Sequence, residues 1–113
     1  MSLPQALRLR SKQDFARIFR RGKRRHFGVA FVLTFKDAEL RSPRVGVVVS
    51  KKVFKKAKDR NYLRRIVKHC LYAQKDKLSQ RDIVWVAQPK FSKLERSAWY
   101  ATVQQQVAEL EQV

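Results

Sequence analysis

Two dense basic windows interrupt the apolar pattern of this sequence and limit what the chain can fold into. Residues 8–25 and 51–68 each contain nine Lys or Arg and a single Asp, so together they carry +16 of a net charge of +18. The apolar residues, 44% of the chain, occur in short runs separated by turn signals. At 113 residues the chain has room for one hydrophobic core, so we expect a single domain over residues 1–113.

A field this positive favours a polyanionic partner. Charge that served only to keep the protein in solution would have little reason to be concentrated in two windows. No stretch approaches the ~20 apolar residues of a membrane span, and the first residues lack the apolar core of a secretory signal. We therefore expect a cytoplasmic protein that binds nucleic acid and has no membrane partner.

The first basic window predicts a short amphipathic helix. Phe15, Ile18 and Phe19 follow helical spacing and form an apolar face, while the arginines point elsewhere. Ser11 is the candidate N-cap, and Gly22 is the expected stop.

The rest of the chain predicts strands and two more helices. Residues 27–35 alternate with period two, and residues 44–50 are rich in β-branched side chains, so both are expected to be strands that pair in antiparallel fashion. Residues 82–87 form a nearly unbroken apolar run that suits a covered strand. Helical spacing returns around residues 61–71 and 92–111.

This order of elements indicates an α+β fold, an α/β sandwich built on a small sheet. Trp85 and Trp99 are expected in its core. Cys70 has no partner for an internal disulfide and lies on the apolar face of the second helix, so we expect a buried structural thiol.

Residues that could form a catalytic centre or a metal site are scarce. His26 follows two arginines, which favours a surface or phosphate-contacting role, and His69 and Cys70 are adjacent in a helix and do not share a face. The Asp residues are isolated and most stand beside Lys or Arg, so surface ion pairs explain them. The three glycines are too far apart for a phosphate-binding loop. We expect no catalytic residue, metal site or protein-bound cofactor in this chain.

The second basic window has a more specific interpretation than charge alone. Its lysines cluster where a strand ends and a helix begins, and the amide groups of a helix N-terminus also attract phosphate. Its arginines can grip phosphate oxygens with a planar fork, and Asn61 can bind a sugar hydroxyl or a base edge. A solvated helix face is the alternative, but we expect this window to bind structured RNA.

Two interpretations stay open for Phe15 and Phe19. Aromatic residues at helical spacing usually belong to a core. These two, however, stand beside many Lys and Arg and are expected to face a strand that contains Phe27, Phe31 and Phe35. A groove between this helix and this strand could stack unpaired bases, and both roles can hold together.

Three stretches of the sequence form a recognisable combination. Residues 7–22 are the basic helix, and residues 82–87 are the apolar strand. Residues 44–65 lead from a strand that ends in Ser-Lys-Lys to a helix that opens with Arg-Asn and continues with Arg-Arg, a spacing that is unusual elsewhere. Over nearly the whole chain these stretches resemble the protein subunit of bacterial ribonuclease P. The family signature is Arg-Asn-Arg, and Tyr62 occupies its third position here, so the contacts of that arginine do not transfer.

The resemblance implies an endonuclease holoenzyme that removes the 5′ leader of precursor tRNA. A large RNA with bound Mg²⁺ would do the chemistry, and the partners would be ribonuclease P RNA and precursor tRNA, with no obligate protein partner. The implied fold is a four-stranded sheet in the order αβββαβα with a left-handed strand–helix–strand crossover, against the usual handedness. The residues implied to bind the catalytic RNA are Lys51, Lys52, Lys56, Arg60, Asn61, Arg64, Arg65 and Lys68. The residues implied to bind the leader, in the groove beside the first helix, are Phe15, Arg17, Phe19 and Phe31.

The same charges and aromatic rings would serve a structural RNA-binding protein, such as a ribosomal component or an RNA chaperone, which is the alternative function. A DNA-binding architectural protein has less support because no recognition helix or dimer seam stands out. A protein-only nuclease has the least.

Overall fold

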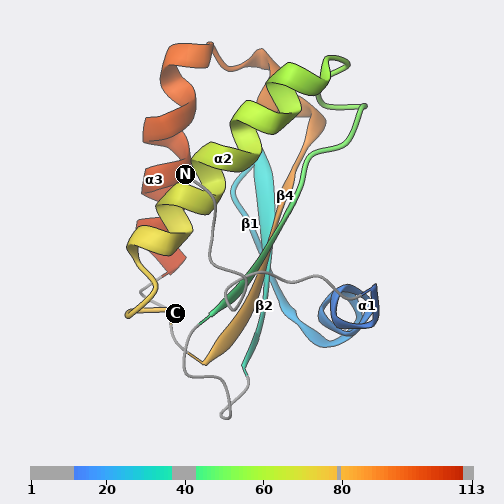
Figure 1. Ribbon diagram of the computed structural model, residues 1–113, viewed down its shortest axis with the longest axis vertical. Coiled ribbons are helices and arrows are strands. Elements are labelled where there is room, and N and C mark those ends of the chain that lie inside the picture. Colours follow the sequence, from blue (N-terminus) through green and yellow to red (C-terminus); the bar gives the residue numbers. More distant parts are fainter. Residues whose placement is uncertain (1–11, 37–42, 79, 111–113) are drawn as a thin grey trace.

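The structure, a computed structural model, describes residues 12–36, 43–78 and 80–110 (Figure 1). No helix in this part of the chain is both long and apolar enough to cross a membrane. The elements follow the expected order αβββαβα, with two short 3-10 helices before the last helix. They are α1 (Lys12–Arg21), β1 (Lys23–His26), β2 (Ala30–Lys36), β3 (Arg44–Val48), α2 (Ala57–Ala73), β4 (Arg81–Ala87), η2 (Pro89–Lys93), η3 (Arg96–Ala98) and α3 (Trp99–Leu110).

Helix α1 ends where the sequence predicts. The Gly22 N–H donates to the Ile18 carbonyl oxygen at 2.8 Å and closes the last turn. A Cβ atom at Gly22 would lie 2.5 Å from that same oxygen, so a larger residue does not fit without a shift of the backbone. The predicted N-cap, Ser11, lies outside the described residues.

The sheet has the strand order β1-β2-β4-β3. β4 pairs antiparallel with β2 and parallel with β3, so it lies between them. The expected antiparallel pairing of residues 27–35 with residues 44–50 is therefore wrong. β4 is the most buried of the strands, and a position between β2 and β3 covers both of its edges as well as both of its faces.

The predicted long strand over residues 27–35 is divided into a turn and a strand. Phe27 donates its N–H to the Ala30 carbonyl at 2.8 Å, and Gly28 has a φ of 82°, a conformation that favours glycine. Before this turn, the basic segment Lys23–His26 forms β1, which pairs with β2 along one edge of the sheet. Such a strand has no apolar side chain from which periodicity could be detected.

Helices α2 and α3 pack together on one face of the sheet, and α1 lies against the other (Figure 1). The larger core lies under α2 and α3, and it contains Trp85, Trp99 and Cys70, as predicted. The Trp85 Nε1 atom donates to Gln106 Oε1 at 2.9 Å, so the indole is satisfied inside this core. The parallel unit β3–α2–β4 is the one to which the expected crossover refers, and its left hand stays a prediction from the resemblance.

Cys70 gives the core a test in solution. Burial raises the pKa of its thiol from 9.0 to about 11, because desolvation penalises the thiolate. The native state thus holds this proton more tightly than the unfolded chain, and the resulting stabilisation is lost as the pH rises from about 9 to about 11. At about pH 8 we predict alkylation of native protein about 100-fold slower than that of urea-unfolded protein. Equal rates would contradict the burial.

Candidate nucleic-acid interface

The strand register aligns three rows of side chains on the face of the sheet toward α1. Each row runs from β2 through β4 to β3, and the second and third rows begin on β1. The first row consists of Phe35, Asp82 and Arg44, the second of Arg24, Leu33, Val84 and Gly46, and the third of His26, Phe31, Val86 and Val48.

Helix α1 is fixed on the first two rows. Ile18 is fully buried together with Leu33 and Val84 of the second row, and Phe15 packs against this cluster. Phe19, one residue further along α1, is 43% exposed. Phe15 is therefore partly buried against the core, and Phe19 offers its ring to solvent.

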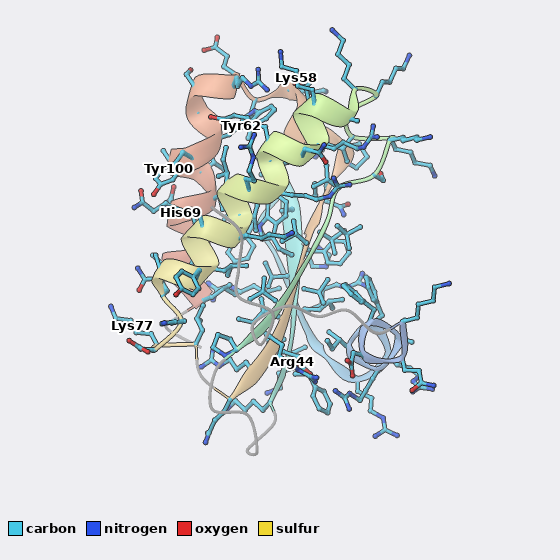
Figure 2. All side chains as sticks on the ribbon, viewed as in Figure 1. Arg44, Lys58, Tyr62, His69, Lys77 and Tyr100 are labelled. Carbon is cyan, nitrogen blue, oxygen red and sulfur yellow. The ribbon has the colours of Figure 1, made fainter. Side chains whose placement is uncertain are left out.

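A buried carboxylate ties α1 to the edge strand β3. Asp82 is fully buried and accepts from Arg44 Nε at 2.8 Å, from Arg44 Nη2 at 2.9 Å and from Arg17 Nη2 at 3.2 Å. Asp14 of α1 adds longer contacts to both arginines, at 3.4 and 3.5 Å. Figure 2 shows Arg44 on the side of the sheet that faces α1. The expectation of a surface ion pair is thus wrong for Asp82, because its row lies beneath α1, where only paired charge is tolerated.

In the third row His26 is exposed, whereas Phe31, Val86 and Val48 are partly buried and pack against the Ile18 cluster. We call its four residues, His26, Phe31, Val86 and Val48, the aromatic strip. The Arg24 guanidinium carbon lies 4.3 Å from the centroid of the Phe31 ring, and the His26 ring lies at 5.9 Å from it. The strip therefore combines an apolar floor with a cation and an imidazole beside its central ring.

Of this strip, the sequence had assigned only Phe31 to the leader, and it had given His26 a surface or phosphate-contacting role. Arg24 and His26 belong to β1, the strand that periodicity could not show, and alternate residues of that strand face α1. Val48 and Val86 enter through the parallel pairing of β3 with β4, in place of the expected pairing of residues 27–35 with residues 44–50. Of the other residues assigned to the leader, Arg17 is held by two carboxylates and is one-third exposed.

The eight residues assigned to the catalytic RNA lie on the turn before α2 or on the outward side of α2. Lys51, Lys52 and Lys56 are exposed, and their side chains have no hydrogen bond or ion pair with another described residue. Lys56 is also the N-cap residue of α2, and its side chain makes no capping bond. The first N–H groups of α2 therefore have no side-chain acceptor at the cap and lie within a group of lysines, which is an arrangement that attracts phosphate.

Two arginines of this set hold the structure together. Arg60 Nη1 donates to the carbonyl oxygens of Phe54 and Lys55, at 2.9 and 2.8 Å. Arg64 donates to Asn61 Oδ1 at 2.7 Å and to the Val49 carbonyl at 3.3 Å. These contacts fix the lysine-bearing turn against α2, and they leave Arg65, which is exposed, as the more available guanidinium.

In the described ranges no group of three or more His, Cys, Asp or Glu side chains is placed to hold a metal ion. The two described histidines lie against aromatic rings, His26 against Phe31 and His69 against Tyr100. The buried acid, Asp82, faces two arginines. The chemistry that this part of the chain offers is binding through cations and stacking rings.

A family model described as Ribonuclease P matches residues 3–111, nearly the whole chain. The chain belongs to this family. The prediction that it is a protein subunit of the ribonuclease P holoenzyme, which processes tRNA 5′ ends, is confirmed, and ribonuclease P RNA is its partner. The α+β fold that the family resemblance implied is also confirmed.

Curated relatives and solved structures agree with this membership. The ribonuclease P protein component of Coxiella burnetii is 32% identical over 104 residues, 92% of this chain and 85% of the relative. That of Streptococcus agalactiae is 35% identical and covers 85% of this chain and 86% of its own. The RNase P protein structure from Thermotoga maritima has a TM-score of 0.80 at 30% identity and covers 94% of this chain and 96% of its own. The Staphylococcus aureus structure, at 24% identity, has a TM-score of 0.84 over 96% and 98%, and this likeness shows the fold.

The buried carboxylate predicts a stability effect. Replacing Asp82 by Asn removes the charge that Arg17 and Arg44 share, and we expect the free energy of unfolding to fall by about 3 kcal/mol. Urea unfolding followed by circular dichroism measures this loss. The control is Asp59→Asn, because Asp59 pairs with Arg96 at 3.1 Å on the surface and should cost less than about 1 kcal/mol. Equal losses of unfolding free energy in the two variants would contradict the role of Asp82 in joining α1 to β3.

Proposed function

We propose that this ribonuclease P protein binds two RNA strands on two neighbouring surfaces. The lysine turn and the outward side of α2 bind ribonuclease P RNA, and the aromatic strip beside α1 binds the single-stranded 5′ leader of precursor tRNA. The observation that carries the second assignment is the partly buried Phe31 ring, with the Arg24 guanidinium carbon at 4.3 Å from its centroid, together with the exposed Phe19 ring on α1.

The strip has the chemistry that unpaired nucleotides need. Every base has a π-face, and each base that stacks on an aromatic ring gains about 1–3 kcal/mol without regard to its sequence. The exposed Arg24 stands against the Phe31 ring and can meet a phosphate, and the exposed Arg20 and Arg21 directly follow Phe19 on α1. This combination favours single-stranded RNA over a duplex, whose bases are already stacked.

The turn before α2 suits folded RNA instead. Lysine ammonium groups and open helix amides act on phosphate charge and do not require accessible bases. The third row of the sheet ends at Val48, only three residues before Lys51, so the strip leads from α1 toward this turn. A leader bound on the strip would therefore lie next to the RNA bound on α2.

We assign the cleavage step to ribonuclease P RNA and to Mg²⁺ held by that RNA. In this chain the described His and Asp residues named above are placed against aromatic rings or arginines. They do not converge on a common point as an acid, a base and a nucleophile would. No protein partner is required by the proposal.

Reconstitution tests the function as a whole. We expect the purified protein alone to leave precursor tRNA uncut and to restore cleavage by bacterial ribonuclease P RNA at low magnesium. With about six to ten phosphates neutralised, RNA affinity should fall by about 10³ to 10⁵ between about 50 and 200 mM salt. Failure to rescue cleavage at any salt concentration would favour a ribosomal or chaperone role.

Substitutions at two exposed side chains test the two surfaces separately. Phe19→Ala should weaken holoenzyme binding of precursor tRNA by about 5-fold to 100-fold through the loss of one stacked base, and should leave mature tRNA unaffected. Arg65→Gln should instead weaken assembly with ribonuclease P RNA and reduce the log-salt slope by about 1. Arg65 is the better choice than Arg60, whose loss would also release the Phe54 and Lys55 carbonyls. Equal losses for precursor and mature tRNA in the Phe19 variant would argue against the strip.

A further inference from the structure

A shallow hollow between α2 and α3 adjoins the RNA surface of α2 at Arg65. It has a volume of about 310 Å³ and is lined by Tyr62, Arg65, Ile66, His69 and Tyr100. Tyr62 and Tyr100 are 36% and 44% exposed, and in the described chain only Phe19 joins them as a large hydrophobic side chain with such exposure. Figure 2 shows Tyr62 and His69 on α2 and Tyr100 on the neighbouring α3.

The rings of the hollow are held in position by their neighbours. The Tyr62 ring lies 5.8 Å from the Trp99 ring, and the Arg96 guanidinium carbon lies 4.6 Å from the Tyr62 centroid. Arg96 is itself paired with Asp59 at 3.1 Å. Tyr100 packs against His69 with a centroid distance of 5.9 Å. Rings that are fixed before a ligand arrives lose little conformational entropy on binding.

We propose that this hollow binds one unpaired nucleotide of the RNA that docks on α2, with the base stacked on a tyrosine ring and a phosphate near Arg65. The proposal rests on the proposed function and extends its RNA surface around α2. It names a stacking site on a surface to which only charge contacts and Asn61 had been assigned.

The charge around the hollow selects an anionic occupant. Lys58, Tyr62, Arg65 and His69 form one stripe along α2, at the spacing that places residues on a common face. Asp59, the acid next to this stripe, is neutralised by Arg96. A second copy of the chain would bring another net charge of +18 to this rim and would be repelled. The hollow also adjoins the RNA surface directly, because Arg65 belongs to both.

Substitutions at Tyr100 test the proposal in the assembled complex. Tyr100→Ser should raise the Kd for ribonuclease P RNA by about 5-fold to 100-fold, and Tyr100→Phe and Tyr100→Trp should keep the affinity of the parent protein. Because stacking releases no counterions, the log-salt slope should not change in Tyr100→Ser, in contrast to Arg65→Gln. The matched control is Gln105→Ala, an exposed position on α3 that does not line the hollow.

Three results would overturn the stacking site. One is an unchanged Kd in Tyr100→Ser, and another is an equal loss in Tyr100→Phe, which retains the ring. The third is a change in the sedimentation coefficient of the free protein in Tyr100→Ser, which would identify the hollow as a contact between copies. Circular dichroism confirms that each variant is folded. If the parent protein itself fails to bind or to rescue ribonuclease P RNA, the proposed function fails, and this outcome is distinct from a failure at Tyr100 alone.

Discussion

The Asp82 carboxylate is the contact on which the position of α1 over the sheet depends. It joins Arg17 of α1 to Arg44 of β3 across the central strand, and it is fully buried. A buried carboxylate has no alternative partner once its water is removed, so the two arginines are held where it lies. Helix α1 is thereby kept over the first two rows of the sheet, with the partly buried third row beside them.

Several arginines that look alike in the sequence have different tasks in the structure. Arg17 and Arg44 neutralise a buried acid, and Arg60 and Arg64 bind backbone carbonyls around the turn before α2. A guanidinium can make several directed hydrogen bonds at once, which suits it to fixing loops. The lysines of that turn cannot do this and remain mobile point charges for phosphate. Counting basic residues in a window therefore overstates how many of them are available to RNA.

The sequence predicted local structure well where apolar spacing was strong, as in α1, α2 and β4, and it failed where pairing is long-range. β1 has no apolar side chain, so periodicity could not detect it. The predicted leader site therefore did not include Arg24 and His26. The pairing of β2 with β3 looked economical because they are neighbours in sequence, but β4, the most buried strand, takes the place between them. The Tyr62 and Tyr100 pair comes from two helices almost 40 residues apart, a proximity that no local pattern encodes.

The central position of β4 also determines when this protein can fold during its synthesis. β2 and β3 do not pair with each other. The strand that joins them into one sheet, β4, begins only at Arg81. Until the ribosome has released that segment, the nascent chain has a two-stranded hairpin and isolated helices but no sheet that could support a core. Its two cationic windows emerge first and are exposed to cellular polyanions in this period. A chain that ends before β4 would therefore keep most of its positive charge but would lack the folded sheet that positions the charged side chains.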